Sequence, residues 1–394
     1  MTLRTDQTIS NATMSQVGRG RPRVAVLYHQ FPHYRAPVLR LLSQSEAYGY
    51  SFYGSLNDFS GIRAFTGDES IRIEPLNVVK TKRGFRISGI GKIIRSSFDA
   101  YIILGNPNIQ ATWLLAIWGR LTGKKVLFWT HGWLKRERGL QRSIRRLYYC
   151  LAHTVLVYGE RAREIGRLEG FPEDRIRVIY NSLDYAESER ILEKLESGTV
   201  QPLAKSLFTE PERPLLICTA RLTDLCKLDL LIMAAATLSR RGTPVNVLLV
   251  GDGPARERLE VLARNLSVDV HFFGACYDES TVGQLIYEAD ATVSPGKIGL
   301  TAIHSLTYGT PAFTHGNMDR QMPEVEAIVP GETGGYFREG DADDLAEVLA
   351  RWLLSNPDRT EVRAKCRATV AQKWNPENQR LLIEQALDDC PSGI

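Results

Sequence analysis

Short apolar runs alternate with amphipathic stretches through the first half of the chain. Runs of about four to eight apolar, often β-branched residues are typical of buried strands in a parallel sheet, and a repeat of about 3.6 residues is typical of the helices that cover it. The runs predict strands at Arg23–Tyr28, Tyr50–Tyr53, Ala100–Leu104, Lys125–Trp129, Thr154–Val157 and Ile176–Ile179. Helices are predicted at Val38–Ser45, Gly91–Ser97 and Gln110–Leu121. This alternation predicts a doubly wound α/β domain.

The same alternation returns in the second half after a break. A charged helix predicted at Tyr185–Leu195 and a connector containing Gly and Pro interrupt the pattern. Beyond them, strands are predicted at Leu215–Thr219, Val245–Val250 and Val270–Phe273, and helices at Asp229–Leu238, Ala255–Asn265 and Ser280–Glu288. We therefore predict two facing, doubly wound Rossmann-like domains, residues 21–195 and 196–374, with a cleft between them.

Both ends of the chain depart from this pattern. The helical pattern of Glu361–Asp389 is broken at Asn375 and Pro376, so residues 375–394 are predicted to cross back and pack on the first domain. Residues 1–20 are polar and lack the apolar centre of a signal peptide, which predicts a disordered leader.

One stretch of the second domain, Ala289–Asn317, combines a strand, a glycine turn and a helix. The strand ends at Pro295, Gly296 and Gly299 form the turn, and Leu300–Tyr308 has a helical pattern. The start of such a helix offers unpaired backbone N–H groups and the positive end of its dipole, which together favour a phosphate. An ordinary strand-helix-strand unit with a tight turn is the alternative.

Two cations follow the predicted strand Leu215–Thr219, namely Arg221 and Lys227. Hydrogen bonds from charged donors to phosphate are among the stronger ones, so two cations close to the helix start at Gly299 predict a diphosphate site. Either cation alone is more typical of a surface salt bridge. The turn Gly251-Asp252-Gly253-Pro254 ends the next strand.

Polar residues also follow two predicted strands of the first domain. They are His29, His33, Tyr34 and Arg35 after the first strand, and His131 after Lys125–Trp129. Ligands of open α/β sheets bind beyond the carboxyl ends of the strands. We therefore predict that these side chains line the cleft and that the first four lie on its acceptor side. A purely structural role of the loop histidines is the alternative.

Composition excludes several classes of protein. With 43% hydrophobic and 24% charged residues, the chain of 394 residues is typical of a folded globular protein. No apolar run approaches the ~20 residues that a membrane-spanning helix needs. The six cysteines form no CxxC pair, which argues against a zinc site and a disulfide framework. These features predict a cytoplasmic protein.

The net charge of +4 is unevenly distributed, because the first half of the chain is basic and the second half is acidic. Basic residues concentrate in residues 124–146, together with apolar residues at near-helical spacing. Such a segment can lie on an anionic membrane surface, and a solvated helix face or a nucleic-acid surface are the alternatives. No nucleic-acid-binding motif accompanies the charge. We therefore predict a membrane contact, through Arg138, Arg142, Arg145 and Arg146, and no nucleic-acid partner.

The motifs of the second half occur in a recognisable order. Arg221 with Lys227, Gly251-Asp252-Gly253-Pro254, Phe273-Gly274, Ser294-Pro295 with Gly299-Leu300, and Gly309-Thr310-Pro311 follow one another. This series resembles the retaining nucleotide-sugar glycosyltransferases of family four, the glycogen-synthase-like group.

The resemblance implies the GT-B fold, a donor of the UDP or GDP type in the second domain, an acceptor on the first domain, and no metal ion or other cofactor. It also implies that Arg221 and Lys227 hold the donor diphosphate and that His131 lines the reaction centre. The residues that it implies for nucleotide-sugar binding are Gly253, Gly274, Gly296, Gly299, Leu300, Thr301 and His304.

The sequence departs from the family at two of these positions. Relatives usually carry one glutamate facing the sugar hydroxyls and a second facing the nucleotide ribose, and Gly296 and His304 stand at those positions here. A histidine can accept a hydrogen bond from a hydroxyl group through a ring nitrogen, so we predict that His304 keeps the ribose contact. No residue is predicted to replace the first glutamate.

These observations predict a glycosyltransferase on the inner face of the cell membrane, bound peripherally. It would add a sugar, with retention of configuration, to a lipid-linked or polysaccharide acceptor in surface polysaccharide, lipopolysaccharide or glycolipid biosynthesis. The alternatives are a nucleotide-sugar epimerase or hydrolase of the same fold, and an inactive homologue that binds a nucleotide or a partner.

Overall fold

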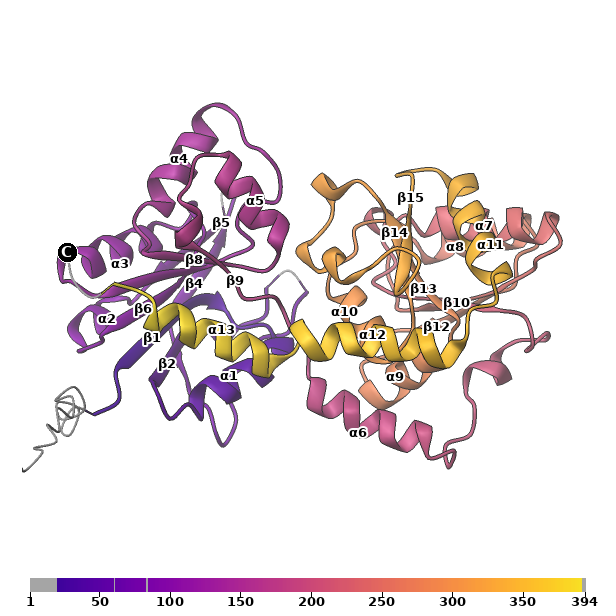
Figure 1. The fold of residues 1–394 in the computed structure, drawn as a ribbon, viewed down its shortest axis with the longest axis horizontal. Coiled ribbons are helices and arrows are strands. Elements are labelled where there is room, and N and C mark those ends of the chain that lie inside the picture. Colours follow the sequence, from indigo (N-terminus) through magenta and orange to yellow (C-terminus); the bar gives the residue numbers. More distant parts are fainter. Residues whose placement is uncertain (1–19, 60, 83, 392–394) are drawn as a thin grey trace, which may run out of the picture.

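The computed structural model describes residues 20–391 except positions 60 and 83. Nearly all of the predicted leader, residues 1–20, lies outside the described residues. Two α/β lobes lie side by side, and the last two helices extend across both of them (Figure 1).

The first lobe is built on a seven-stranded sheet whose strands are all parallel. Its strands are β1 (Arg23–Gln30), β2 (Gly49–Ser55), β3 (Ile73–Pro75), β6 (Ala100–Leu104), β7 (Lys125–Trp129), β8 (Thr154–Val157) and β9 (Ile176–Val178). Their order is β3-β2-β1-β6-β7-β8-β9. In register, Val24 of β1 lies between Tyr50 of β2 and Ala100 of β6. A separate antiparallel hairpin is formed by β4 (Asn77–Thr81) and β5 (Gly84–Ser88).

The second lobe is built on a six-stranded parallel sheet. Its strands are β10 (Leu215–Thr219), β11 (Asn246–Val250), β12 (Val270–Gly274), β13 (Ala291–Ser294), β14 (Ala312–His315) and β15 (Gly334–Phe337). The order β12-β11-β10-β13-β14-β15 reverses direction between β10 and β13, as the first sheet does between β1 and β6. Open α/β sheets bind ligands at such reversal points, beyond the carboxyl ends of the strands.

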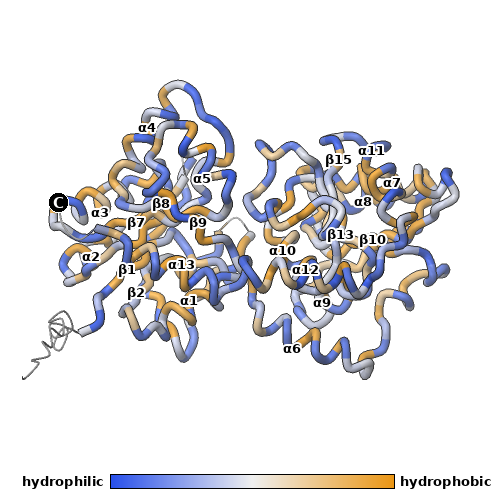
Figure 2. The backbone as a smooth tube through the Cα atoms, viewed as in Figure 1, coloured by the Kyte–Doolittle hydropathy of each residue, from blue (hydrophilic) through white to orange (hydrophobic). Residues whose placement is uncertain are grey.

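Helices cover both sheets. In the first lobe they are α1 (Ala36–Ser43), α2 (Gly91–Arg95), α3 (Gln110–Leu121), α4 (Gly139–Tyr149) and α5 (Glu160–Leu168). They continue with α6 (Tyr185–Glu196), α7 (Leu228–Arg240), α8 (Arg256–Asn265), α9 (Glu279–Glu288), α10 (Leu300–Thr307), α11 (Ala342–Leu354), α12 (Arg359–Lys373) and α13 (Pro376–Asp388). Hydrophobic residues concentrate along central strands such as β7 and β10 (Figure 2). None of the described helices is both long and apolar enough to cross a membrane.

Helix α6 packs in the second lobe, although the sequence assigns its residues to the end of the first domain. Ile191 and Leu192 are buried in one cluster with Leu215 of β10 and Leu285 of α9. Asp184 is the N-cap of this helix, and its side chain accepts a hydrogen bond from the N–H of Glu187. The chain therefore passes from one lobe to the other before α6.

The predicted return of the C-terminus is present. Asn375 caps α13 by accepting a hydrogen bond of 2.8 Å from the N–H of Asn378, and Pro376 opens that helix, so α12 stops there. Helix α12 packs on α10 of the second lobe, with Val370 buried beside Ile303. Helix α13 packs on the first sheet, with Leu387 buried in that lobe's core.

Candidate active site

Loops at the carboxyl ends of strands in the two sheets face each other across the lobes. Lys297, after β13, is close enough to His131, after β7, to help lower the pKa of that imidazole. Arg221, after β10, places its Nη1 atom 3.4 Å from the position that a Cβ atom would occupy on Gly61 of the first lobe. The sequence-predicted loops of both halves thus contribute to one site.

Arg221 and Lys227 lie at the two ends of one short loop of the second lobe. Among the described residues, neither side chain has a hydrogen-bond or ion-pair partner, and both are exposed. Lys227 has a left-handed backbone, with φ of 52°, and directly precedes α7. A non-glycine residue rarely adopts this conformation, and doing so costs about 1 kcal/mol. Two unpaired cations at the start of a helix provide the charge that a diphosphate requires.

Gly296 fixes the position of this loop. Its N–H donates to the carbonyl oxygen of Cys226 at 3.1 Å, so that N–H is not free for a donor sugar. A Cβ atom on Gly296 would lie 2.3 Å from the carbonyl oxygen of Leu225. No side chain fits there without moving the loop that carries Lys227, which gives a steric reason for a glycine where relatives carry a glutamate.

Gly253 and Gly274 make close contacts within the protein, next to the same loop. These contacts give the two glycines a structural role. A Cβ atom on Gly253 would lie 2.4 Å from the carbonyl oxygen of Leu222. The N–H of Leu222 donates to Asp252 at 3.1 Å. Gly274, with φ of 87°, accepts a hydrogen bond of 2.8 Å from the N–H of Gly251.

The first turn of α10 opens beside this loop. Gly299 is the N-cap, with φ of −134°, and Leu300 and Thr301 follow it. The N–H groups of Leu300 and Thr301 have no backbone acceptor among the described residues, as expected at a helix start, whereas the N–H of Ala302 donates to the carbonyl oxygen of Gly299 at 2.9 Å. These donors and the helix dipole favour an anion at the turn.

Arg35 is the cation of the first lobe at this site. It is only 5% exposed, and its guanidinium lies over the rings of Tyr28, Trp129 and Tyr158 at 4.6, 4.9 and 5.6 Å from their centroids. Its Nη2 donates to the hydroxyl group of Tyr158, whereas Nε and Nη1 have no partner among the described residues. An arginine keeps its charge even when buried, so the aromatic rings stabilise a permanent cation at the edge of the cleft.

His131 remains neutral at physiological pH. Burial, together with the positive charges of Arg35 and Lys297, lowers the pKa of this imidazole to about 4. Its ring lies 5.0 Å from the ring of Tyr158 in an edge-to-face arrangement. A neutral imidazole can accept a hydrogen bond from a hydroxyl group, which an imidazolium cannot do.

The other residues predicted for the acceptor side occupy different environments. Tyr34 is half-buried near Arg35, and burial raises the pKa of its hydroxyl group. His29 stacks on Phe85 of β5 with 4.4 Å between ring centroids, and burial lowers its pKa to about 4. His33 is exposed. The structure therefore brings Tyr34 and Arg35 to the site, and it places His29 against the hairpin.

His304 has a protein partner that the sequence did not indicate. Its Nε2 lies 2.8 Å from Oε1 of Glu279, and the hydroxyl group of Tyr308 donates to the same oxygen at 2.8 Å. Burial raises the pKa of the Glu279 carboxyl, but its hydrogen bonds with His304 and Tyr308 outweigh that effect, so the pKa is lowered. A ribose contact through Nδ1 of His304 stays a prediction.

Two carboxylates on the 3-10 turn Pro323–Ala327 were missed by the sequence reasoning. Glu324 is buried between the lobes, and Asn181 donates to its Oε1 at 2.6 Å. Glu326 accepts hydrogen bonds from the N–H groups of Glu160 and Arg161, at 2.7 and 2.9 Å, and so caps α5 from the other lobe. Only the position of this turn in three dimensions distinguishes these two glutamates from surface carboxylates.

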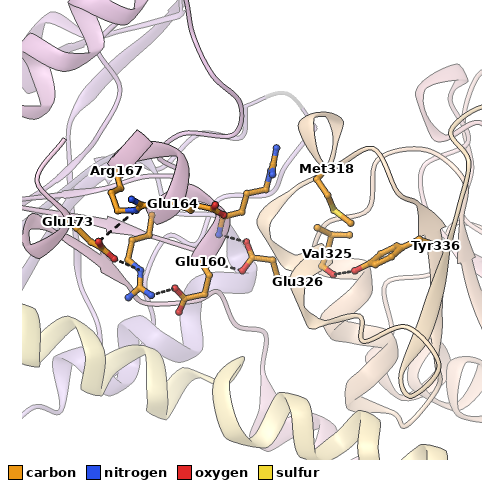
Figure 3. A pocket seen from close by; sticks show the side chains of 10 residues that line it. Glu160, Glu164, Arg167, Glu173, Met318, Val325, Glu326 and Tyr336 are labelled. Atoms are coloured by element: carbon orange, nitrogen blue, oxygen red, sulfur yellow. Dashed lines mark hydrogen bonds and ion pairs between the residues drawn. The ribbon is translucent and has the colours of Figure 1, made fainter. Parts of the chain in front are cut away.

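A cavity of about 470 Å³ opens beside this interdomain contact. Figure 3 shows Glu326 reaching from the second lobe to the start of α5, with Glu160, Glu164 and Arg167 on one wall and Tyr336 on the other. A Cβ atom on Gly159 would lie 2.4 Å from Oε1 of Glu326, so a glycine is needed for the close approach.

Arg145 does not belong to a lipid-facing surface, contrary to the expectation from its sequence neighbourhood. It forms a two-pronged contact with Glu137, at 2.8 and 2.6 Å, and donates to the carbonyl oxygen of Gly132 at 3.2 Å. Arg142 pairs with Glu169. The amphipathic pattern of α4 thus has one arginine on its protein-facing side, where it holds the loop that contains His131.

Within residues 20–391, apart from positions 60 and 83, no group of three or more His, Cys, Asp or Glu residues is placed to hold a metal ion. Metal independence stays a prediction.

Comparison with known proteins concentrates on the second half of the chain. Residues 201–371 match the family described as glycosyl transferases group 1. A GDP-mannose-dependent alpha-(1-6)-phosphatidylinositol dimannoside mannosyltransferase of Mycobacterium tuberculosis is 31% identical over 173 residues, which cover 42% of this chain and 42% of that protein. An alpha-monoglucosyldiacylglycerol synthase of Streptococcus pneumoniae is 27% identical over 192 residues, covering 47% of this chain and 41% of that protein. The chain thus spans less than half the length of these two relatives.

The whole fold has counterparts among solved structures. The crystal structure of Anabaena HepE in complex with UDP superposes with a TM-score of 0.66 over 94% of this chain and 100% of that one, at 14% sequence identity. The two-lobed arrangement of doubly wound sheets predicted from the sequence is confirmed.

Proposed function

We propose that this chain, whose residues 201–371 match the family of group 1 glycosyl transferases and which has the two-lobed GT-B fold, transfers a sugar from a nucleotide-diphosphate donor to a glycolipid or polysaccharide acceptor. The observation that carries the proposal is the pair of unpartnered cations, Arg221 and Lys227, beside the open first turn of α10. Their charge matches a diphosphate, which is the part common to all such donors.

The proposed chemistry follows from where charge develops. As the sugar leaves its nucleotide, positive charge grows on the sugar and negative charge on the leaving phosphate. Arg221, Lys227 and the N–H groups of Leu300 and Thr301 would stabilise the phosphate, which lowers the barrier. The neutral His131 imidazole would accept a hydrogen bond from a hydroxyl group at the reaction centre. We propose retention of configuration, with the leaving phosphate taking the acceptor's proton on the same face.

The donor would be of the UDP or GDP type, bound without a metal ion. Support comes from the relatives, one of which is named for GDP-mannose, and from the UDP complex of the similar Anabaena structure. The acceptor would be lipid-linked or a polysaccharide, as in surface polysaccharide or lipopolysaccharide biosynthesis, and it would approach from the first lobe past Tyr34 and Arg35.

The function is tested by incubating the protein with a panel of nucleotide sugars and measuring nucleoside diphosphate release, with and without lipid and oligosaccharide acceptors. We expect release from at least one donor, increased by an acceptor. Release of no nucleoside diphosphate from any donor, by protein that binds the nucleotide, would instead favour the inactive homologue.

A lipid-linked acceptor makes a membrane contact useful, and α4 offers one. Leu140 and Leu147 are 75% and 64% exposed on this helix, and Arg138 and Arg146 beside them have no ion-pair partner among the described residues. An exposed apolar stripe flanked by arginines suits the boundary of an anionic bilayer. We propose that α4 holds the protein peripherally on the inner face of the cell membrane.

We expect the protein to sediment with acidic liposomes and less so with neutral ones. Replacing both Arg138 and Arg146 by Ala should weaken the association by roughly 2 kcal/mol, at ~1 kcal/mol for each basic residue, and added salt should have a similar effect. Arg145→Ala is unsuitable as a control because it disturbs Gly132, so Arg264→Ala in the second lobe serves instead. Equal binding to neutral and acidic vesicles would contradict the prediction.

A further inference from the structure

Glu324 is a buried carboxylate with one free oxygen. The side chain is 2% exposed, and its Oε1 accepts the hydrogen bond of 2.6 Å from Asn181. Its Oε2 is buried and has no partner among the described residues. Leaving a buried charged acceptor unpaired is destabilising, so a native protein rarely does so without a use for the atom.

The free oxygen lies against the start of α10. It is 4.0 Å from the position that a Cβ atom would occupy on Gly299. Two contacts hold the segment before Glu324 on this turn: Gln321 Oε1 accepts from the N–H of Ile298 at 2.8 Å, and the N–H of Met322 donates to the carbonyl of Ile298 at 3.3 Å. The place of Glu324 beside the turn is therefore fixed by the fold.

Charged and polar groups of both lobes surround this carboxylate. Arg35 from the first lobe and Lys297 from the second stabilise its charge, while burial acts against it and raises its pKa. Tyr34 of the first lobe is near enough to be influenced by it. Glu324 thus lies between the start of α10 in the second lobe and Arg35 of the first lobe.

We propose that Oε2 of Glu324 accepts hydrogen bonds from hydroxyl groups of the donor's sugar and so positions the ring between the turn at Gly299 and His131. This inference rests on the proposed function. A carboxylate repels a phosphate, which has only acceptor oxygens near neutral pH, whereas sugar hydroxyls are donors and match a free carboxylate oxygen.

Glu326, two residues further on, shows what a purely structural carboxylate looks like in the same turn. Both of its oxygens are occupied, by the N–H groups of Glu160 and Arg161. Glu324 is more deeply buried than Glu326 and uses a single oxygen for the fold, through Asn181. The free Oε2 of Glu324 can therefore position a ligand, whereas Glu326 only links the two lobes.

The test uses Glu324→Gln, which keeps the shape and an oxygen for Asn181 but puts an NH₂ donor in place of Oε2. Calorimetry would compare a nucleotide sugar with its nucleoside diphosphate, and kinetics would compare that donor with analogues lacking one ring hydroxyl. We expect kcat/KM to fall roughly 10- to 100-fold, with nucleoside diphosphate affinity unchanged within about twofold. With the native protein, kcat/KM for one deoxy analogue should be lower than for the complete donor. With Glu324→Gln, the two values of kcat/KM should become similar.

Asn181→Ala removes the other hydrogen bond and serves as the structural comparison. If Glu324 only linked the two lobes, Glu324→Gln and Asn181→Ala would have the same effect on activity and on Tm. The proposed role predicts instead that only Glu324→Gln abolishes discrimination among the deoxy analogues. Native-like discrimination in Glu324→Gln would overturn the inference. The native protein could bind the nucleotide sugar more tightly than the nucleoside diphosphate and yet transfer no sugar, and this result would overturn the proposed function. Calorimetry would then still test Glu324, because the proposed role predicts that Glu324→Gln removes the difference in affinity between the nucleotide sugar and the nucleoside diphosphate.

Discussion

Replacing Arg221 or Lys227 by Ala is expected to reduce sugar transfer by roughly 10²-fold or more, because each variant removes a charge that would stabilise the leaving diphosphate. Among the described residues, neither side chain pairs with a carboxylate, so its loss removes no salt bridge. The fold should therefore be retained, and the thermal midpoint of both variants should stay within a few degrees of the native value. Transfer assays with the best donor of the panel, together with circular dichroism, would measure both quantities.

Arg264→Ala is a matched control for these two variants. Arg264 is also exposed in the second lobe, but it lies in the last turn of α8, at the opposite end of that helix from the Gly253 turn. We expect native turnover for this control. Near-native turnover in both Arg221→Ala and Lys227→Ala would remove the diphosphate assignment.

Gly296→Glu is expected to abolish transfer rather than improve it, although it restores the residue that relatives carry. The new side chain would begin 2.3 Å from the carbonyl oxygen of Leu225, so the loop that ends at Lys227 must move. A displacement of about 1 Å at a reacting group can cost roughly 10²-fold in rate. The loss should therefore be similar to that of Lys227→Ala, and nucleoside diphosphate affinity, measured by calorimetry, should fall with it.

Gly316→Ala gives the corresponding control for adding a side chain to a glycine of the same lobe. Its Cβ atom would lie 3.5 Å from Tyr336, an ordinary contact distance, and we expect little change in activity. A Gly296→Glu variant with native or higher activity would show that the loop can relax and that the glutamate is usable here.

The regular parts of the fold were predictable because each buried strand is a short apolar run bounded by turn residues. The predicted ranges of β6, β7, β8 and β10 coincide with the observed strands. The short strand β3, the hairpin β4–β5 and the polar helix α5 were not predicted. Their residues are partly exposed, so their sequences lack the apolar period that identifies a covered element.

The residues of the candidate site were predictable where charged or titratable side chains lie shortly after a strand in the sequence. Arg221, His131 and Arg35 all follow strands at the carboxyl edges of the sheets, and the structure gathers these edges together. Glu324 and Glu279 could not be found in this way, because the first lies in an irregular turn and the second at the start of α9, and neither directly follows a strand. Their importance comes from partners distant in sequence, Asn181 and His304, and only tertiary structure reveals such pairs.

The hydrogen bond from Arg145 to the carbonyl of Gly132 has a mechanical consequence. The same helix, α4, carries the exposed leucines on one side and this arginine on the other. Gly132 adjoins His131, so a tilt or rotation of α4 on contact with lipid would shift the imidazole by way of a single side chain. If α4 contacts lipid as proposed, this hydrogen bond would link the membrane contact to the cleft of the first lobe, and the rate of reaction would then depend on whether the protein is bound to the membrane.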